Sequence, residues 1–501
     1  MAKYLSDFLN RFSMYKVVSL SLTVLFVFAF VLSLLGILAY SPLAMLTSVG
    51  VIGFSVFLTS ILFGYLFGVR VHIESSFITG MILFFIFTPT LEMTGLLALA
   101  VVGCIAGASK FLLVYRGRHV FNPVAIAAAI AALAGLEYAS WWVATPLLVP
   151  LTLVLGFFII QKTRRVPVAG TFMGISVALV MTMLLIQGNS LSESFGLLFS
   201  WPIFFFSAFM LTEPLTLPPK KWQQVIEAVI VALLFSVPLQ IGDFTMGPAF
   251  ALIAGNLFAF IFVRQGALSL TYETMKPLTP SSFEFAFRPK KKVTYQPGQY
   301  LEMTIVHKKS DFRGERRSFS ITSAPGSDLI TIGVKFYEPS SSYKKVLKSL
   351  EKGLVVTATG IRGDFTLPKD LTIPLLFIAG GIGITPFISQ LRYLASLNVK
   401  RDITLLYAVN NESEIAYKDV LSAAGIKVVI VTKQTAQLKL PNGWTQATQP
   451  VINQETIATY VPDSASRNAY ISGPPLMIDG VKNHLKKLNG KNIKTDYFIG
   501  Y

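Results

Sequence analysis

The chain has few of the side chains that bind metals or cross-link proteins. Its 501 residues include one cysteine and four histidines. A single cysteine cannot form an intrachain disulfide, and it cannot supply an iron–sulfur cluster or a cysteine-ligated zinc ion. No histidine falls in the middle of an apolar segment, so the sequence does not predict a pair of haem ligands on facing transmembrane helices. We therefore expect no metal site.

Charged residues are also scarce, and they are unevenly distributed. Only 14% of the residues are charged and 53% are hydrophobic, with a mean hydropathy of +0.60, far from the average of soluble proteins. The net charge of +17 is compatible with nucleic-acid binding. Many of the cations, however, stand in short connections between apolar segments, which favours a protein of the lipid bilayer and argues against a nucleic-acid partner.

Ten apolar segments are long enough to span, or nearly span, a bilayer. We place them near 17–40, 43–68, 75–90, 93–115, 121–137, 143–160, 168–187, 195–212, 223–241 and 247–263. Alternate connections carry cations: Arg70, Arg116, Arg118, Lys162, Arg164, Arg165, Lys220, Lys221 and Arg264. The other connections carry acids: Glu92, Glu137, Glu193 and Asp243. The positive-inside rule then predicts a multi-pass protein of the cell membrane, with the N-terminus and the C-terminal domain in the cytoplasm.

Prolines indicate an internal repeat in this half. Three of them recur in the same order 125 residues later: Pro42, Pro89 and Pro123 as Pro167, Pro214 and Pro248. A unit of five spans has an odd number of crossings, so its second copy would be inverted in the membrane. Chance is the alternative, because proline is common in membrane helices.

Three polar stretches interrupt the apolar pattern at the predicted cytoplasmic ends. They cover 75–80, 118–123 and 211–218, and they include Asn122-Pro123 and Thr212-Glu213-Pro214. With these motifs, the chain from about 15 to 265 resembles the flavin-carrying membrane subunit of Rnf complexes and of sodium-translocating NADH:quinone reductases. The resemblance implies that Asn122 and Thr212 border a flavin-type cofactor.

The same resemblance implies an FMN phosphoester-linked to a threonine, with riboflavin as a further ligand of the helical core. Thr171, in the predicted loop Val166-Pro167-Val168-Ala169-Gly170-Thr171, is the candidate for that link. The acidic and serine residues that precede the threonine in the family are absent from this loop. The alternative is a threonine in the first turn of a helix, with no cofactor.

Lys110, in the fourth segment, has two interpretations. It either contacts an oxygen of a flavin or quinone, or extends its ammonium to the membrane surface.

The C-terminal half has the pattern of a soluble α/β protein. Closely spaced strands near 295–303, 316–321 and 329–336 predict an antiparallel β-barrel, and strands near 374–379, 403–409 and 427–432 alternate with helices as in a doubly wound sheet. We therefore divide the chain into a transmembrane helical domain (1–266), a β-barrel FAD domain (267–370) and an NAD(P)-binding α/β domain (371–501).

A glycine-rich turn between a strand and a helix lets a pyrophosphate approach backbone amides. Here that turn is Gly380-Gly381-Ile382-Gly383-Ile384-Thr385-Pro386. Together with Arg317-Ser318-Phe319-Ser320 and Ser472-Gly473-Pro474-Pro475, it makes residues 268–501 resemble the ferredoxin–NADP reductase superfamily. The resemblance implies that Arg317 pairs with the FAD pyrophosphate, that Phe319 packs on the flavin ring and that Ser320 reaches flavin N5. Packing without a cofactor is the alternative for the aromatic residues.

The chain departs from that superfamily at three places. Ser472 replaces the usual cysteine beside the nicotinamide. The helix that meets the FAD phosphates offers Ser341, Ser342 and Lys344 instead of the usual hydroxyl near the position of Lys344. The chain continues to Tyr501, so that Phe498 is the first choice, and Tyr501 the second, for the C-terminal aromatic that covers the flavin.

These features predict a membrane-bound oxidoreductase. Hydride from NADH or NADPH would reduce FAD, and electrons would enter the membrane domain and reach a quinone or an extracytoplasmic acceptor. Ser320, Ser472 and Phe498 are the predicted catalytic residues. Two alternatives are a redox-coupled sodium transporter, for which we find no convincing mid-span carboxylate, and a cytoplasmic reductase with an inert membrane anchor.

Overall fold

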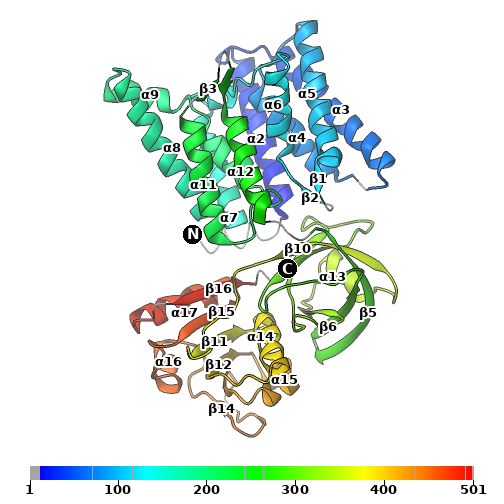
Figure 1. Ribbon diagram of the computed structural model, residues 1–501, viewed down its shortest axis with the longest axis vertical. Helices are drawn as coiled ribbons and strands as arrows, with labels where there is room; N and C mark the ends of the chain where they lie inside the picture. The colour runs from blue at the N-terminus through cyan, green and yellow to red at the C-terminus, as the bar shows by residue number, and fades with distance from the viewer. Residues whose placement is uncertain are drawn as a thin grey trace. The chain divides into compact units, whose positions relative to one another are not determined.

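The computed structural model describes residue 9 and residues 12–69, 71–115, 118–237, 239–241, 244–262, 266–434, 436–490 and 492–498. Its internal contacts divide the chain into two units, Met1–Gly266 and Ala267–Tyr501. Each unit has its own hydrophobic core, and their elements are labelled in Figure 1.

Unit 1 is helical. Its helices are α2 (Met14–Leu34), α3 (Pro42–Leu66), α4 (Ile73–Ile86), α5 (Met93–Leu112), α6 (Pro123–Leu133), η1 (Trp142–Ala144), α7 (Val149–Thr163), α8 (Val166–Ile186), α9 (Leu191–Leu198), α10 (Ile203–Phe205), the π-helix η2 (Phe206–Leu211), α11 (Lys221–Ser236) and α12 (Pro248–Phe262). Two antiparallel hairpins precede α6 and α12: β1 (Val114–Tyr115) with β2 (Arg118–His119), and β3 (Leu239–Ile241) with β4 (Phe244–Met246). Each of the ten predicted segments overlaps at least one of these helices.

Four described helices, α2, α3, α5 and α8, are long and apolar enough to cross a bilayer. The pair formed by α9 and the continuous stretch α10–η2 also qualifies if it is taken as one span with a 45° bend. The apolar helices α4, α6, α7 and α12 are shorter. Length and composition therefore support four spans in the described part of unit 1, or five with the bent pair.

The order of elements in unit 1 repeats at the spacing of the prolines. The series α3, α4, α5, hairpin, α6 is followed by α8, the bent pair, α11, hairpin, α12. The two hairpins begin at Val114 and Leu239, and the helices after them begin at Pro123 and Pro248, an offset of 125 residues in both cases. The sequence does not predict the hairpins, so their matching positions are a separate sign of the repeat.

Two local predictions in unit 1 are wrong. Residues 75–80 do not interrupt a helix, because they lie within α4. There Thr79 Oγ1 donates to the Ser75 carbonyl (2.9 Å) and Ser76 Oγ donates to Ser60 Oγ (3.2 Å), so the polar side chains are satisfied without breaking the helix. The predicted loop 166–171 is likewise helical, because Pro167 occupies the first turn of α8, where its fixed φ and missing N–H are tolerated.

The N-terminal part of unit 2 is an antiparallel sheet. Its strands are β5 (Leu268–Thr279), β6 (Ser282–Pro289), β7 (Tyr300–Thr304), β8 (Arg316–Ser320), β9 (Ile330–Lys335) and β10 (Val355–Arg362), in the order β8-β7-β10-β5-β6-β9. A bridge between Ile321 and Ile332 links the two edges of this sheet. Helix α13 (Ser342–Lys348) contributes the fully buried Tyr343 to the core.

The C-terminal part of unit 2 is a parallel sheet covered by helices. It contains β11 (Leu375–Gly380), η3 (Gly381–Ile384), α14 (Thr385–Ser396), β12 (Ile403–Ala408), η4 (Glu412–Glu414), α15 (Lys418–Ala423), β13 (Lys427–Val431), β14 (Trp444–Gln446), α16 (Gln454–Tyr460), β15 (Asn468–Gly473), α17 (Pro475–Lys487) and β16 (Ile493–Tyr497). The strand order is β14-β13-β12-β11-β15-β16. Helices α14 and α15 pack on one face, and α16 and α17 on the other (Figure 1). Every residue of β11 is buried, as expected for a strand covered on both faces.

Candidate functional site

The centre of the parallel sheet is the natural place for a ligand. Strand β11 stands between β12 and β15, so the order of the strands reverses there. Open α/β sheets bind ligands outside the carboxyl ends of the strands at such a point. In this chain those ends carry the glycine-rich turn after β11 and the Ser472–Pro475 segment at the end of β15.

The backbones of these two segments touch. A Cβ atom added to Gly383 would lie 2.6 Å from the Ser472 carbonyl oxygen and 2.7 Å from Gly473 Cα. Gly381 has φ +53° and nothing within 4 Å of an added Cβ, so its backbone is open to a close-lying group. Thr385 and Pro386 are buried where α14 begins. This arrangement fits the pyrophosphate of a dinucleotide at the N-terminus of a helix.

The C-terminal strand adds an acid that the sequence does not predict. Ser320 Oγ, at the end of β8, donates to Asp496 Oδ2 (3.3 Å). In the parallel pairing of β15 with β16, Asp496 stands opposite Ser472. The Phe498 amide donates to the Gly473 carbonyl (2.8 Å). The three predicted catalytic residues are therefore gathered around Asp496.

The hydroxyl of Ser472 has an unusual environment. The residue is completely buried, and Ser472 Oγ has no hydrogen-bond partner among the described residues. A buried polar group without a partner is costly, and a bound ligand would remove that cost. Ser472 thus fits a position beside a nicotinamide. The alternative aromatic Tyr501 lies outside the described residues.

Sequence comparison agrees with this geometry. Residues 377–483 match the family model described as the oxidoreductase NAD-binding domain. The C-terminal half contains an oxidoreductase NAD-binding domain. This confirms the prediction that this half binds a nicotinamide dinucleotide.

Curated relatives of the chain include an electron transfer component, an oxidoreductase and a flavohemoprotein. The chain is 30% identical over 229 residues to the 2-halobenzoate 1,2-dioxygenase electron transfer component of Burkholderia cepacia, covering 43% of this chain and 62% of that protein. It is 27% identical over 198 residues to an NADPH oxidoreductase of Mycobacterium tuberculosis (39% and 48%) and 26% identical over 228 residues to a flavohemoprotein of Bacillus cereus (41% and 54%). The chain thus spans about half to three fifths of the length of these relatives.

In the antiparallel sheet, strand β8 holds Arg317 and Phe319 in buried positions. Arg317 Nη1 donates to the carbonyls of Arg313, Gly314 and Arg316, and its guanidinium carbon lies 5.1 Å from the Tyr343 ring centre. Phe319 is buried, with its ring centre 6.0 Å from that of Tyr343. Phe319 therefore packs in the core, whereas Ser320 lies at the strand end next to Asp496.

The predicted phosphate donors near α13 have local roles. Ser341 caps the helix by accepting from the Lys344 amide (3.3 Å), and Ser342 Oγ accepts from the Asp311 amide (2.9 Å). Lys344 Nζ donates to the Lys335 carbonyl (2.8 Å). Burial, followed by the charges of Arg317 and Arg313, lowers the pKa of Lys344 to about 8. These contacts are enough to explain all three side chains without a cofactor.

Unit 1 contains a polar cluster where α6 begins. Asn122 caps α6 by accepting from the Val124 and Ala125 amides (3.0 and 3.1 Å), and Asn122 Nδ2 donates to Glu213 Oε2 (2.7 Å). The backbone N–H of Asn122 donates to Asn256 Oδ1 of α12 (2.8 Å). Residues that are far apart in the sequence of unit 1, from the start of α6, from Glu213 and from α12, thus meet at this cluster.

A small cavity adjoins the cluster. It is lined by Tyr115, His119, Val120, Leu215, Thr216, Asn256 and Phe260. Asn256 is 1% exposed, and its Nδ2 has no hydrogen-bond partner among the described residues. This amide can donate to an acceptor oxygen in the cavity.

The other predicted residues of unit 1 lie in different surroundings. Thr212 Oγ1 donates to the Ala208 carbonyl (2.7 Å), so its hydroxyl is satisfied by the helix that ends just before it. Thr171 is half-buried in the second turn of α8. Lys110 is buried and donates from Nζ to the Ser75 carbonyl (3.0 Å), which favours an internal contact over extension to the surface.

Unit 1 contains a buried carboxylate that its sequence pattern does not indicate. Glu227 lies seven residues into α11 and is completely buried. Helix α11 is not among the described helices that are long and apolar enough to cross a bilayer, so the prediction that no carboxylate is convincingly placed in mid-span stays a prediction. Glu227 was overlooked because it follows the polar run Lys221-Trp222-Gln223-Gln224, which is typical of a helix end at the membrane surface.

Proposed function

We propose that the chain is a membrane-bound flavoprotein oxidoreductase that takes hydride from NADH or NADPH onto FAD and passes electrons into or across the membrane. The observation that carries this proposal is the gathering of Ser320, Ser472 and Phe498 around Asp496. Ser472, predicted to lie beside the nicotinamide, belongs to the parallel sheet, and Ser320, predicted to lie beside the flavin, belongs to the antiparallel sheet. Both hydroxyls are needed at one place only if the two cofactors meet there.

The chain's own residues would bind and orient the two cofactors. The backbone of Gly380–Gly383 would hold the dinucleotide pyrophosphate at the start of α14, with Pro474 and Pro475 bordering the nicotinamide. Arg317 would pair with the FAD pyrophosphate, because a guanidinium binds phosphate oxygens strongly. Asp496 orients the Ser320 hydroxyl. FAD, when bound, supplies the hydride-accepting chemistry.

The proposal for unit 1 is a ten-span domain with an inverted repeat and a second flavin, FMN or riboflavin. Asn256 supports it, because its side-chain amide would donate to an acceptor oxygen of a flavin ring or a quinone head. The neighbouring cavity has room for about one water, so such a ligand would have to widen it. Thr171 is the candidate for covalent FMN attachment. The terminal acceptor is a quinone or an extracytoplasmic substrate, and the NAD-binding domain faces the cytoplasm.

Flavin analysis tests both halves of this proposal. The chain is purified in detergent, and its flavins are identified before and after acid precipitation. We expect FAD and a second flavin in equal amounts, together with flavin reduction by NADH or NADPH. FAD alone would contradict the proposal for unit 1 and support a reductase with an inert anchor. If the second flavin is covalent, Thr171→Ala should release it from the precipitate, whereas Thr163→Ala, a matched threonine of α7, should not.

Glu227 favours a second candidate, a redox-coupled sodium transporter. A carboxylate buried within a membrane helix is costly and commonly marks an ion pathway. In proteoliposomes, NADH added outside reaches only the outward-facing NAD-binding domains. NADH-driven uptake of radioactive sodium that is lost in Glu227→Gln would support this candidate. Electron transfer without sodium uptake would contradict it.

A further inference from the structure

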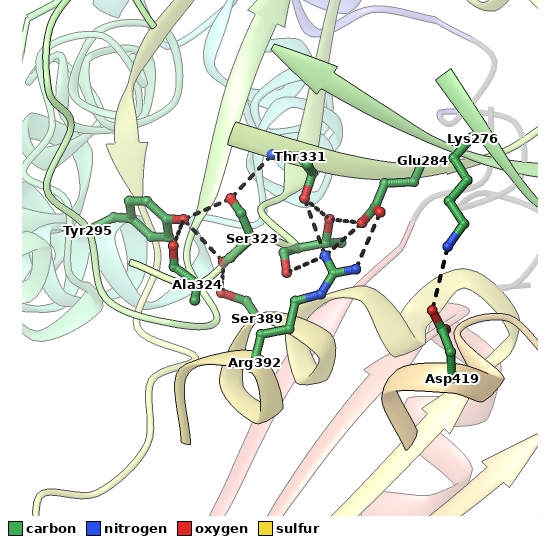
Figure 2. A network of polar contacts seen from close by, with 10 residues as sticks. Lys276, Glu284, Tyr295, Ser323, Ala324, Thr331, Ser389, Arg392 and Asp419 are labelled. Carbon is green, nitrogen blue, oxygen red and sulfur yellow. Dashed lines mark hydrogen bonds and ion pairs between the residues drawn. The ribbon is translucent and has the colours of Figure 1, made fainter. Parts of the chain in front are cut away.

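Helix α14 connects the nucleotide side of the site to the antiparallel sheet. It begins at Thr385, directly after the glycine-rich turn, and carries Ser389 and Arg392 on its next two turns. Arg392 lies seven residues, or about 10 Å, along the helix from Thr385. Figure 2 shows Arg392 and Ser389 reaching the residues of the antiparallel sheet.

Arg392 makes several bonds to that sheet. Nη1 donates to Glu284 Oε1 of β6 (2.8 Å), to the Thr322 carbonyl (3.1 Å) and to Thr331 Oγ1 (3.4 Å), and Nη2 donates to Glu284 Oε2 (3.3 Å). Thr322 Oγ1 also donates to Glu284 Oε1 (2.7 Å). The Glu284 side chain is only 11% exposed, so water screens this bidentate ion pair little.

The segment held by Arg392 follows the flavin-side serine. Thr322 and Ser323 come two and three residues after Ser320. Ser389 Oγ donates to the Ser323 carbonyl (2.7 Å), and on the other side of the segment Tyr295 OH donates to the Ala324 carbonyl (2.8 Å). The segment that follows Ser320, up to Ala324, is therefore held between α14 and Tyr295 (Figure 2).

We infer that Arg392 is a positioning residue: with Ser389, it fixes the distance between the flavin-side Ser320 and the nicotinamide-side Ser472. This inference rests on the proposed hydride transfer. The connection runs from the glycine-rich turn through α14 to Thr322 and Ser323, and from there two residues back to Ser320. Hydride transfer depends steeply on such spacing, because a 1 Å misplacement can slow a reaction by about 100-fold.

A second ion pair likewise joins the antiparallel sheet to a helix of the NAD-binding domain and provides a matched control. Lys276 of β5 and Asp419 of α15 approach to 3.5 Å, but both side chains are 65% exposed. Exposed pairs contribute little because water and salt screen them. Lys276→Met should therefore leave flavin reduction unchanged, although it also removes an ion pair between the antiparallel sheet and a helix of the NAD-binding domain.

The test compares three variants of the full chain in detergent. Arg392→Met is combined with Glu284→Gln, so that no buried carboxylate is left without its cation. Ser389→Ala removes the bond to the Ser323 carbonyl without changing any charge. It tests the inference if the double variant does not fold. Each is examined for FAD content, NAD⁺ and NADP⁺ affinity, the single-turnover rate of flavin reduction, and hydrogen exchange of the Thr322 amide.

For the double variant we expect flavin reduction to slow by about 10-fold to 100-fold. FAD content and nucleotide affinity should stay within about 2-fold, since the binding residues are untouched. The Thr322 amide, which donates to the Thr331 carbonyl at 2.8 Å, should exchange faster. Ser389→Ala should show the same changes to a smaller extent.

Three results would overturn the inference alone. They are an unchanged rate despite faster exchange at Thr322, a loss of rate that only parallels loss of FAD, and an equal loss of rate in Lys276→Met. Failure of either nucleotide to reduce the flavin of the unmodified chain would instead overturn the proposed function, and this inference with it.

Discussion

Replacing Gly383 with alanine adds a methyl group between two backbones that are already in contact. The added Cβ would lie 2.6 Å from the Ser472 carbonyl oxygen and 2.7 Å from both the Ser472 carbonyl carbon and Gly473 Cα. Non-bonded heavy atoms normally stay about 3.5–4.0 Å apart. Because these neighbours are backbone atoms, a change of side-chain rotamer cannot relieve the contact. The turn after β11 and the end of β15 must move apart by about 1 Å.

The size of the effect follows from this displacement. Extra atoms in a well-packed interior cost about 1–3 kcal/mol. For a unit of this size, each kcal/mol lowers the unfolding midpoint by about 2–4 °C, which gives a decrease of about 2–12 °C. The two displaced segments are those that would hold the pyrophosphate and border the nicotinamide. A shift of about 1 Å should therefore also slow hydride transfer, by about 100-fold.

The assay measures thermal unfolding of the purified chain and single-turnover reduction of its flavin by NADH and NADPH. Gly480→Ala is the matched control, because nothing lies within 4 Å of its added Cβ and it stands in the interior of α17. Alanine there should stabilise the helix by up to about 1 kcal/mol and leave the rate unchanged. If Gly383→Ala matched the unmodified chain in both measurements, the close approach of the two segments would have no role in the site.

Two further predictions concern charged groups of unit 2. Asp496→Asn should slow flavin reduction by about 10-fold to 100-fold. This is less than the full effect of about 10²–10⁴ for losing an acid–base group, because asparagine can still accept from Ser320. Asp479→Asn, which changes an exposed acid that accepts from Tyr497 OH (3.0 Å), should leave the rate unchanged, and equal rates in both variants would refute a role for Asp496. Lys344 has a folded-state pKa of about 8 against an ordinary value of 10.5, so between these values the unfolded chain binds more protons and stability rises with pH. Lys344→Met should flatten the rise in unfolding midpoint over this window, and an unchanged slope would contradict the assignment.

Periodic patterns in the sequence account for most of the fold. The alternation of buried and exposed residues predicts the strands near 295–303, 316–321 and 329–336, and β7, β8 and β9 lie within these ranges or extend them by one residue. The apolar run before the glycine-rich turn likewise becomes β11. These patterns succeed because burial on one or both faces determines the composition of a strand before any long-range contact forms.

The errors in unit 1 have a different physical origin. Serine and threonine between 75 and 80 indicate an interruption only if their hydroxyls lack partners, and the helix carbonyls and Ser60 provide those partners. Glu227 looks like part of a polar helix end because sequence shows the run before it and not the packing around it. In both cases the sequence gives the polarity of a residue, whereas the neighbouring helices decide its environment.

Asp496 shows why part of the site could not be predicted. The alternation in Ile493-Lys494-Thr495-Asp496-Tyr497 indicates a strand, but nothing local says that Asp496 stands opposite Ser472 or beside Ser320. That placement depends on the pairing register of β16 with β15 and on the approach of β8 from the other sheet. A register shift of one residue would turn Asp496 to the opposite face of the sheet.

The dependence on β16 separates two parts of the proposed reaction. The glycine-rich turn and Ser472 belong to β11 and β15, which pair with each other without β16. Asp496 and Phe498 reach the site only through the pairing of β16, and Phe498 is held there by its bond to the Gly473 carbonyl. Displacement of the C-terminal strand would therefore remove the acid and the aromatic together while leaving the pyrophosphate cradle intact. Displacing β16 should thus slow hydride transfer while leaving nucleotide affinity nearly unchanged, because the glycine-rich turn that would bind the pyrophosphate stays in place.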